Sequence, residues 1–268
     1  MAVPDKEFIR NAFDSITPRY DLLNQILSFG MAEAWRKRSA EILLSDPDFS
    51  PKTILDLGCG TGKFLECFLR RREQQVPASV AGTQDPALRR REQQVPASVP
   101  GARGPGVKGA WESATGVDFS AAMLKKARET VSGNVMWLRE DFDSLPFLES
   151  SFDLVISGFT LRSVQKLPEF LGHVYRILTP GGKAAFLDLT RPRNFWARLL
   201  FFPYLKFILP LLGWLLTGNL KAYHFLSGSV RSFQSPEETI RLMQNLGYRD
   251  SMSKSFAFGA ATLIIGTK

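Results

Sequence analysis

Apolar and polar residues follow one another along the chain in two different periods. Residues 6–16 and 21–44 place apolar side chains three and four positions apart, which predicts amphipathic helices interrupted at Pro18 and Gly30. From residue 53 onward, short runs rich in β-formers alternate with further helical stretches. This alternation predicts a single α/β domain with a parallel sheet flanked by helices.

The strands of this sheet are predicted from short apolar runs. Five of them are "TILDLG" (53–58), "ATGVDF" (114–119), "NVMWLRE" (134–140), "FDLVISGF" (152–159) and "KAAFLDLT" (183–190). Near the end of the chain, a helical stretch precedes "YRDSMSKSFAF" and "ATLIIGT", which are joined through Gly259. These last two runs predict an antiparallel hairpin, so the sheet is expected to have seven strands with the last one antiparallel.

A duplicated segment interrupts the pattern after the first predicted strand and helix. The twelve residues "LRRREQQVPASV" occur at 69–80 and again at 88–99. Two copies are too few for a solenoid, which needs at least about three repeats to bury a continuous face. The Gly, Pro, Gln and Ser content favours a mobile surface insertion over residues 70–112, with a regulatory or membrane-docking role as the alternative.

The charge balance favours contact with polyanions only weakly. The chain has 34 Lys plus Arg against 26 Asp plus Glu, a formal charge of +8, which suits nucleic acid or anionic lipid. Residues 70–112 hold eight basic and four acidic residues, so half of this excess lies in the insertion. No basic stripe interleaved with aromatic residues occurs elsewhere, and we do not expect a nucleic-acid partner.

Cysteine and histidine usage limits the chemistry. The chain has two cysteines, Cys59 and Cys67, and its first residues lack the apolar core of an export signal, which favours a cytoplasmic location. Its two histidines, His173 and His224, lie far from both cysteines in the sequence. Because no metal-ligand spacing is recognisable, we expect no metal site.

The glycine loop after the first predicted strand carries the most informative motif. A dinucleotide fingerprint starting at Gly58 would need a third glycine at the position held by Lys63. The chain instead has an acidic residue, Asp56, two positions before the first glycine of G-C-G-T-G. We expect Gly58 and Gly60 to contact a ligand that bears an amino-acid group, whose ammonium Asp56 binds directly or through water.

Acidic residues follow the next two predicted strands as well. Asp118 is placed to accept hydrogen bonds from a ribose diol, and Met123 lies one helical turn later, where it would cover an adenine face. Asp141 would take the adenine amino group, while the amide of Phe142 meets a ring nitrogen. Three successive strand ends therefore fit S-adenosylmethionine as cofactor. Taken singly, the three aspartates have ordinary explanations as a turn cap, a helix N-cap and a loop acid.

This cofactor set resembles that of the class I methyltransferases, with their Rossmann-like seven-stranded sheet. A narrower resemblance, to the ubiquinone/menaquinone biosynthesis C-methyltransferase family, covers nearly the whole chain outside the insertion. The stretches that carry it are "FDSITPRYDLLNQILSFGMAEAWRKR", "LPFLESSFDLVISGFTLRSV", "RILTPGGKAAFLDLTRP" and "YHFLSGSVRSFQSPEETIRLMQNLGY". The resemblance implies methyl transfer from S-adenosylmethionine to a ring carbon of a polyprenylated benzoquinol or naphthoquinol. It leaves that choice and the oligomeric state open, and a homodimer is compatible with it.

The resemblance also implies roles for individual residues. Thr61 and Gly158 join the cofactor side, and Tyr20, Arg162 and Ser163 the acceptor side. Where the family commonly has serine and asparagine, this chain has Gly158 and Ser163, so its acceptor geometry departs from the family pattern.

The chemistry of Arg162 can be argued further. Because Arg162 stays protonated, we assign it to stabilising oxyanion charge on the quinol or to orienting a water that accepts the proton. Tyr20 would position the quinol oxygen or that water. The ordinary alternatives are a salt bridge for Arg162 and a core position for Tyr20.

An apolar segment at residues 199–216 is long enough to reach across a bilayer. Lys206 and the prolines at 203 and 210 disfavour a membrane span, so the sequence predicts an interfacial pair of helices within an apolar lid at residues 191–230. Flanking basic residues would contact anionic headgroups at the inner face of a membrane. The alternative is an ordinary lid that packs over the sheet.

Two other functions stay open at this stage. One is methylation of a different lipid or phenolic acceptor, which would keep every cofactor residue. The other is a non-catalytic fold that binds S-adenosylmethionine and assembles a quinone-synthesis complex, which the substitutions at Gly158 and Ser163 motivate.

Overall fold

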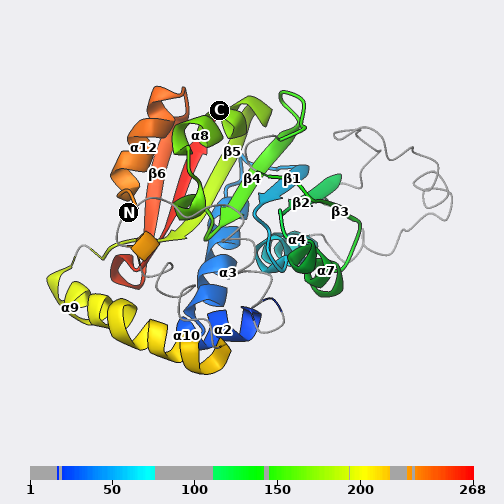
Figure 1. The fold of residues 1–268 in the computed structure, drawn as a ribbon. Coiled ribbons are helices and arrows are strands. Elements are labelled where there is room, and N and C mark those ends of the chain that lie inside the picture. The colour runs from blue at the N-terminus through cyan, green and yellow to red at the C-terminus, as the bar shows by residue number, and fades with distance from the viewer. Residues whose placement is uncertain are drawn as a thin grey trace.

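Seven strands form one sheet in the computed structural model, in the order β3-β2-β1-β4-β5-β7-β6 (Figure 1). The structure describes residue 17 and residues 20–75, 111–141, 145–192, 194–217, 228–230 and 233–268. The strands are β1 (Thr53–Leu57), β2 (Ser113–Val117), β3 (Val135–Leu138), β4 (Phe152–Gly158), β5 (Leu178–Leu189), β6 (Arg249–Phe256) and β7 (Ala261–Thr267). All seven predicted strands are therefore present.

The strand directions also agree with the sequence prediction. Strands β1 to β5 pair in parallel, whereas β7 runs antiparallel to both of its neighbours, β5 and β6. The carboxyl ends of β1, β2 and β4 therefore lie at the same edge of the sheet. Open α/β sheets bind ligands at this edge, where the strand order reverses.

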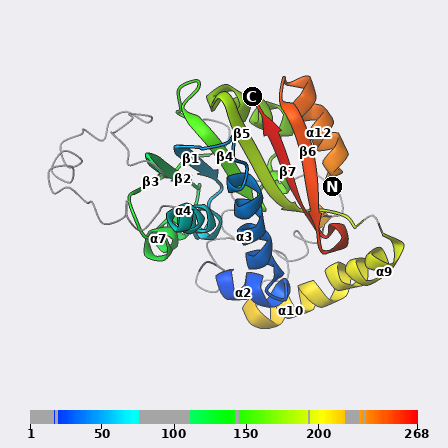
Figure 2. The same cartoon turned by 180° about the vertical axis from the view of Figure 1, so that it is seen from behind.

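Helices cover both faces of the sheet (Figures 1 and 2). The described helices are α2 (Tyr20–Leu27), α3 (Met31–Leu44), α4 (Lys63–Gln75), α7 (Ala121–Thr130), α8 (Leu167–Ile177), α9 (Phe195–Pro203), α10 (Leu209–Thr217) and α12 (Pro236–Asn245). Of these, α2, α9 and α10 lie beyond one end of the sheet rather than on a face (Figures 1 and 2). Short 3-10 turns lie at η2 (Leu161–Ser163) and η4 (Ala257–Gly259). Gly30, in the left-handed conformation with φ 75°, separates α2 from α3 as the sequence predicts.

The two sheet faces bury separate cores. On one face, Leu55, Val155 and Phe186 pack with residues of α8 and α12; on the other, Ile54 and Ile156 pack with residues of α3 and α4. Successive residues of the same strand thus point into opposite cores. Because both faces are buried, the sequences of these strands are nearly continuous apolar runs.

Some expectations differ in extent or lie outside the described residues. Helix α4 continues to Gln75, so the start of the expected insertion is helical, while residues 76–110 and the expected helix at 6–16 are outside the described residues. Strand β5 begins at Leu178 rather than at residue 183, because Leu178 already pairs with Phe152.

The apolar lid differs from the predicted pair of separate helices. Helices α9 and α10 run into each other through the π-helical turn η3 (Tyr204–Ile208), so residues 195–217 form one continuous rod (Figure 1). Pro203 and Pro210 flank this turn. The wider i→i+5 bonding keeps the chain helical where two missing N–H groups would otherwise end an α-helix.

Candidate active site

The glycine loop between β1 and α4 has the backbone that its sequence requires. Gly58, Gly60 and Gly62 adopt φ values of 69°, 53° and 79°, a region that side chains rarely occupy. The N–H groups of Gly58 and Cys59 both donate to Val117 O, at 2.8 and 3.0 Å, which fixes the loop to the end of β2. A Cβ at Gly62 would lie 2.5 Å from a Val131 methyl, whereas a Cβ at Gly60 would meet open space. The loop is therefore packed on one side and open on the other.

Asp56 is a buried carboxylate that the described residues leave unsatisfied. Its exposed fraction is 0%, and neither carboxylate oxygen has a hydrogen-bond partner among the described residues. Burial raises the pKa of Asp56 to about 8. The backbone N–H of Leu65 and the charge of Arg36 oppose this rise, whereas the charge of Asp118 adds to it. A buried carboxyl of this kind fits a cationic ligand group, such as the ammonium of an amino acid.

Asp118 lies beside the loop, as the sequence predicts for a ribose ligand. Its two carboxylate oxygens accept from Gly60 N and Ser120 N, each at 2.9 Å. The Ser120 hydroxyl caps α7 by accepting from Met123 N at 3.1 Å. These contacts fix the carboxylate at the carboxyl end of β2.

Of the remaining predicted cofactor residues, the structure describes Met123 and Asp141 but not Phe142. Met123 is buried in the first turn of α7, and Asp141 is half-buried after β3. Phe142 lies outside the described residues, so the contact expected from its amide stays a prediction.

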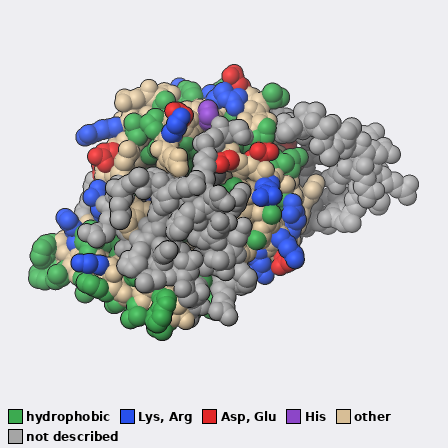
Figure 3. All heavy atoms as spheres, viewed as in Figure 1, with side chains coloured by type: hydrophobic (Ala, Val, Ile, Leu, Met, Phe, Trp, Pro, Cys, Tyr) green, Lys and Arg blue, Asp and Glu red, His purple; other side chains and the backbone are tan. Residues whose placement is uncertain are grey.

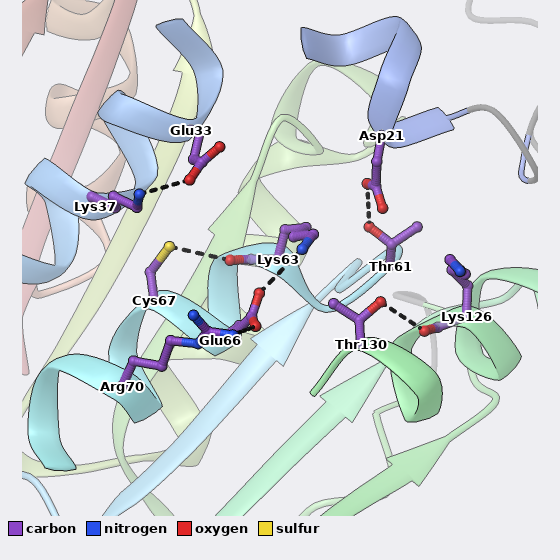
Figure 4. A network of polar contacts seen from close by, with 10 residues as sticks. All are labelled: Asp21, Glu33, Lys37, Thr61, Lys63, Glu66, Cys67, Arg70, Lys126 and Thr130. Atoms are coloured by element: carbon purple, nitrogen blue, oxygen red, sulfur yellow. Dashed lines mark hydrogen bonds and ion pairs between the residues drawn. The ribbon is translucent and has the colours of Figure 1, made fainter. Parts of the chain in front are cut away.

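Helix α2 contacts the glycine loop directly, a feature that sequence reasoning missed. The Thr61 hydroxyl donates to the Asp21 carboxylate at 2.7 Å (Figure 4). Tyr20, the predicted acceptor residue, is half-buried at the start of the same helix. The motif "RYD" contains both residues, but the sequence does not show that Asp21 reaches the loop.

A cavity of about 530 Å³ lies beside this contact, away from the two acids beside the glycine loop. Its walls come from α2, α3, α4 and α7 and include neither Asp56 nor Asp118. Lys63 and Arg70 in its lining are both ion-paired with Glu66 (Figure 4). These two basic side chains of α4 thus share one carboxylate.

Gly158, at the end of β4, packs against an aromatic ring. A Cβ at this position would lie 3.0 Å from the Phe64 ring. The serine of the family pattern would therefore require the ring to move, which gives a structural reason for glycine in this chain.

Arg162 forms a buried ion pair that the sequence did not predict specifically. Its guanidinium Nη1 bonds to Asp188 Oδ1, and its backbone N–H donates to Asp188 Oδ2 at 3.3 Å. The side chains are 8% and 1% exposed. Burial raises the pKa of Asp188, and the guanidinium opposes that rise. Asp188 lies at the carboxyl end of β5, as Asp56 and Asp118 lie at the carboxyl ends of β1 and β2. An acid at the end of a predicted strand is therefore the sequence signal that could have identified Asp188.

Two of the acceptor-side residues, Arg162 and Ser163, lie at the same edge of the sheet as Asp188. Arg162 and the half-buried Ser163 lie in η2, directly after β4, and β5 leads from Asp188 into the lid. This ion pair is the ordinary explanation for Arg162. It also fixes a cation at the carboxyl edge of the sheet, beside the strand that leads into the apolar segment.

Comparison with known proteins defines the family. The model of the ubiE/COQ5 methyltransferase family matches residues 1–268. The chain belongs to the ubiE/COQ5 methyltransferase family. It is 32% identical over 259 residues to a Thermus thermophilus protein named demethylmenaquinone methyltransferase, with 96% of this chain and 99% of the relative covered. It is 30% identical over 267 residues to the Geobacter sulfurreducens ubiquinone/menaquinone biosynthesis C-methyltransferase, with 98% and 89% covered.

A solved structure supports the fold. A Haloferax volcanii methyltransferase, determined in complex with the Trm112 methyltransferase activator, matches with a TM-score of 0.57 at 16% identity, covering 99% of each chain. As a ubiE/COQ5 methyltransferase, the protein uses S-adenosylmethionine. The unsatisfied Asp56 fits the amino-acid part of that cofactor, the fixed Asp118 carboxylate fits its ribose, and the open side of Gly60 leaves room beside the loop.

Proposed function

We propose that this ubiE/COQ5 methyltransferase methylates a ring carbon of a demethylated polyprenyl quinol, either demethylmenaquinol or a demethoxy-type benzoquinol. The observation that carries the proposal is the buried Arg162–Asp188 pair, which lies at the carboxyl edge where the chain enters an apolar lid. A quinol head needs a polar, cationic contact and its prenyl tail needs an apolar surface. The names of the relatives in Thermus and Geobacter support the same acceptor class.

The reaction requires electron density on the ring carbon that receives the methyl group. A quinol that loses its hydroxyl proton pushes charge onto the adjacent carbon. This carbon would take the methyl group of S-adenosylmethionine, breaking its S–CH3 bond and releasing S-adenosylhomocysteine. Loss of the hydrogen from the methylated carbon and return of a proton to the oxygen would restore the quinol. Arg162 stays protonated and stabilises the developing oxyanion, while Asp188 holds the guanidinium in place. Tyr20 positions the quinol oxygen or a water that accepts the proton. Holding both reactants in line contributes further through orientation.

A second candidate function follows from Gly158. With Phe64 packed where a serine side chain would begin, one polar contact of the family pattern is missing. This favours, as the alternative, a protein that binds S-adenosylmethionine and organises a quinone-synthesis complex without turnover. Methylation of another lipid or phenol is a third outcome of the same experiment.

The test is turnover by the purified chain with short-chain demethylnaphthoquinol, benzoquinol and simple phenol analogues, with products identified by mass spectrometry. We expect a ring-carbon product with one or both quinols. Absence of any methylated product would favour the scaffold function, and a product from the phenol alone would assign a different acceptor.

Variants of the ion pair test the role of the cation. Arg162→Met should lower kcat about 100-fold, the usual cost of removing an oxyanion-stabilising donor, while S-adenosylhomocysteine binding stays unchanged. Arg162→Lys keeps the charge and should be less affected. Arg249→Gln, on the exposed edge strand β6, is the matched control. Equal kcat for Arg162→Met and the control would contradict the assignment.

A further inference from the structure

The rod formed by α9, η3 and α10 exposes an unusual amount of apolar surface. Within Phe195–Leu215, only 17% of the most apolar 18-residue window is buried, although the helix is long and apolar enough to cross a membrane by length and composition. Trp196 is 70% exposed and Leu200 77%. Figure 3 shows hydrophobic side chains gathered along this edge of the molecule, with basic side chains beside them. Exposed apolar patches of this size usually mark a docking surface.

The rod has two different faces. One packs on the body, where Leu205 and Leu209 form a cluster with Leu23 and Leu27 of α2. The other, which we call the lid face, consists of Trp196, Leu200, Phe207, Leu211 and Trp214, all exposed. These five residues follow at intervals of four, seven, four and three, the spacing of one side of a helix. The lid face therefore points away from the protein.

The charge around the lid face has a single sign. Between Asp188 and Glu237 the sequence holds no acidic residue and six basic ones: Arg191, Arg193, Arg198, Lys206, Lys221 and Arg231. Arg198 and Lys206 lie on the rod itself, and both are exposed. An apolar helix face flanked by basic residues alone fits an anionic membrane surface.

The contacts of the rod also indicate how it meets the bilayer. A span would pull Leu205 and Leu209 away from α2 and place Lys206 in hydrocarbon, at about 2.5 kcal/mol or more for the charge. The Tyr204 hydroxyl also donates to Leu27 O, which ties the rod to the body. Lying flat, with one face on the protein and the other among acyl chains, satisfies all of these groups.

We propose that the lid face docks this protein on the surface of an anionic lipid bilayer, with the rod parallel to the membrane plane. The docked side is the side of the molecule where β5 leads from Asp188 into the rod. This proposal concerns lipid binding and holds or fails independently of which acceptor is methylated.

The experiment measures co-sedimentation of the full chain with vesicles, in the absence of quinol. We compare phosphatidylcholine alone with phosphatidylcholine containing about 30% phosphatidylglycerol, at low and high salt. We expect binding to the anionic vesicles, weakened several-fold by salt. The triple variant Trp196→Ser, Leu200→Ser, Phe207→Ser should bind these vesicles at least tenfold more weakly.

Matched controls distinguish binding through the lid face from nonspecific hydrophobic or electrostatic binding. Leu148→Ser changes an exposed leucine far from the rod in sequence, and should bind as the parent chain does. Lys206→Gln should weaken binding to anionic vesicles, whereas Lys254→Gln on β6 should not. Because all of these side chains are exposed, each variant should fold, which circular dichroism checks.

Three results would overturn the proposal. The first is a parent chain that binds neither vesicle type. The second is a triple variant that binds as well as the Leu148→Ser control. The third is a lipid-free dimer that the triple substitution dissociates, because the lid face would then be occupied by a second copy of the chain.

Discussion

At the scale of single residues, we expect one carboxyl group of the site to change its charge state when the ligand binds. Asp56 is fully buried without a hydrogen-bond partner among the described residues, and burial raises its pKa to about 8. At neutral pH the ligand-free protein therefore holds this carboxyl protonated. Contact with the ammonium of S-adenosylmethionine favours the ionised form and lowers the pKa again.

This exchange predicts pH-dependent cofactor binding. Below about pH 8, uptake of S-adenosylhomocysteine, which carries the same amino-acid group, should release close to one proton. Its affinity should rise by about tenfold per pH unit between pH 5 and 7 and level off near pH 8. Calorimetry in buffers of different ionisation enthalpy measures the proton release.

The Asp56→Asn variant is the control, because it cannot titrate. It should bind S-adenosylhomocysteine more weakly and release no proton from this position. Proton release on ligand binding that is unchanged in Asp56→Asn would show that another group titrates.

The same pKa shift also affects the stability of the ligand-free protein. Above about pH 4 the unfolded chain ionises Asp56 whereas the ligand-free folded chain does not, so this residue's contribution to the free energy of unfolding falls as pH rises from about 4 to 8.

At the scale of elements, helix α2 links two parts of the molecule that are distant in sequence. Asp21 at its start contacts Thr61 of the glycine loop, and Leu23 and Leu27 pack on the lid rod. The cluster formed with the rod is separate from the two cores that pack on the sheet. Opening of the rod is therefore expected without unfolding of the sheet.

Cavity variants distinguish local opening from global unfolding. Leu205→Ala, in the cluster with α2, should accelerate proteolysis within residues 195–217 and shift the main thermal transition little. Leu171→Ala, in a sheet core, should lower the free energy of unfolding by about 2–5 kcal/mol. Equal loss of global stability in both variants would show that rod and sheet unfold together.

At the scale of the whole molecule, the sheet is completed by β7, which lies between β5 and β6. It pairs with β5 from Lys183↔Thr267 to Leu189↔Ala261 and also with β6. Its residues Leu263 and Ile264 point into opposite cores, so β7 contributes to both. Removing it would expose two neighbouring strands and both cores at once.

A truncation tests this dependence. A chain that ends at Ala260 should lack a cooperative thermal transition, and Leu263→Ala in the full chain should cost about 2–5 kcal/mol of unfolding free energy. Thermal denaturation followed by circular dichroism measures both. A truncated chain that still unfolds cooperatively would show that β1 to β5 form a stable sheet by themselves.

Strands β1, β2 and β4 could be predicted from the sequence because each is a short run that ends at or beside a glycine or an acid. Asp56 and Asp118 could be placed for the same reason, since parallel strands end at one edge. The Asp21–Thr61 and Arg162–Asp188 contacts could not, because they join side chains far apart in the sequence. The continuous rod was missed because its prolines indicate a break, which the π-helical turn avoids.

The position of β7 has a consequence for synthesis on the ribosome. A nascent chain has made β1 to β6 before β7 emerges, so its two apolar sheet faces cannot be completed until β7 has been synthesised. The β6–β7 pair is local, whereas docking β7 on β5 closes a long segment that includes the lid rod. Until that closure, the free edge of β5 and the exposed apolar rod are both available to chaperones or to other nascent chains.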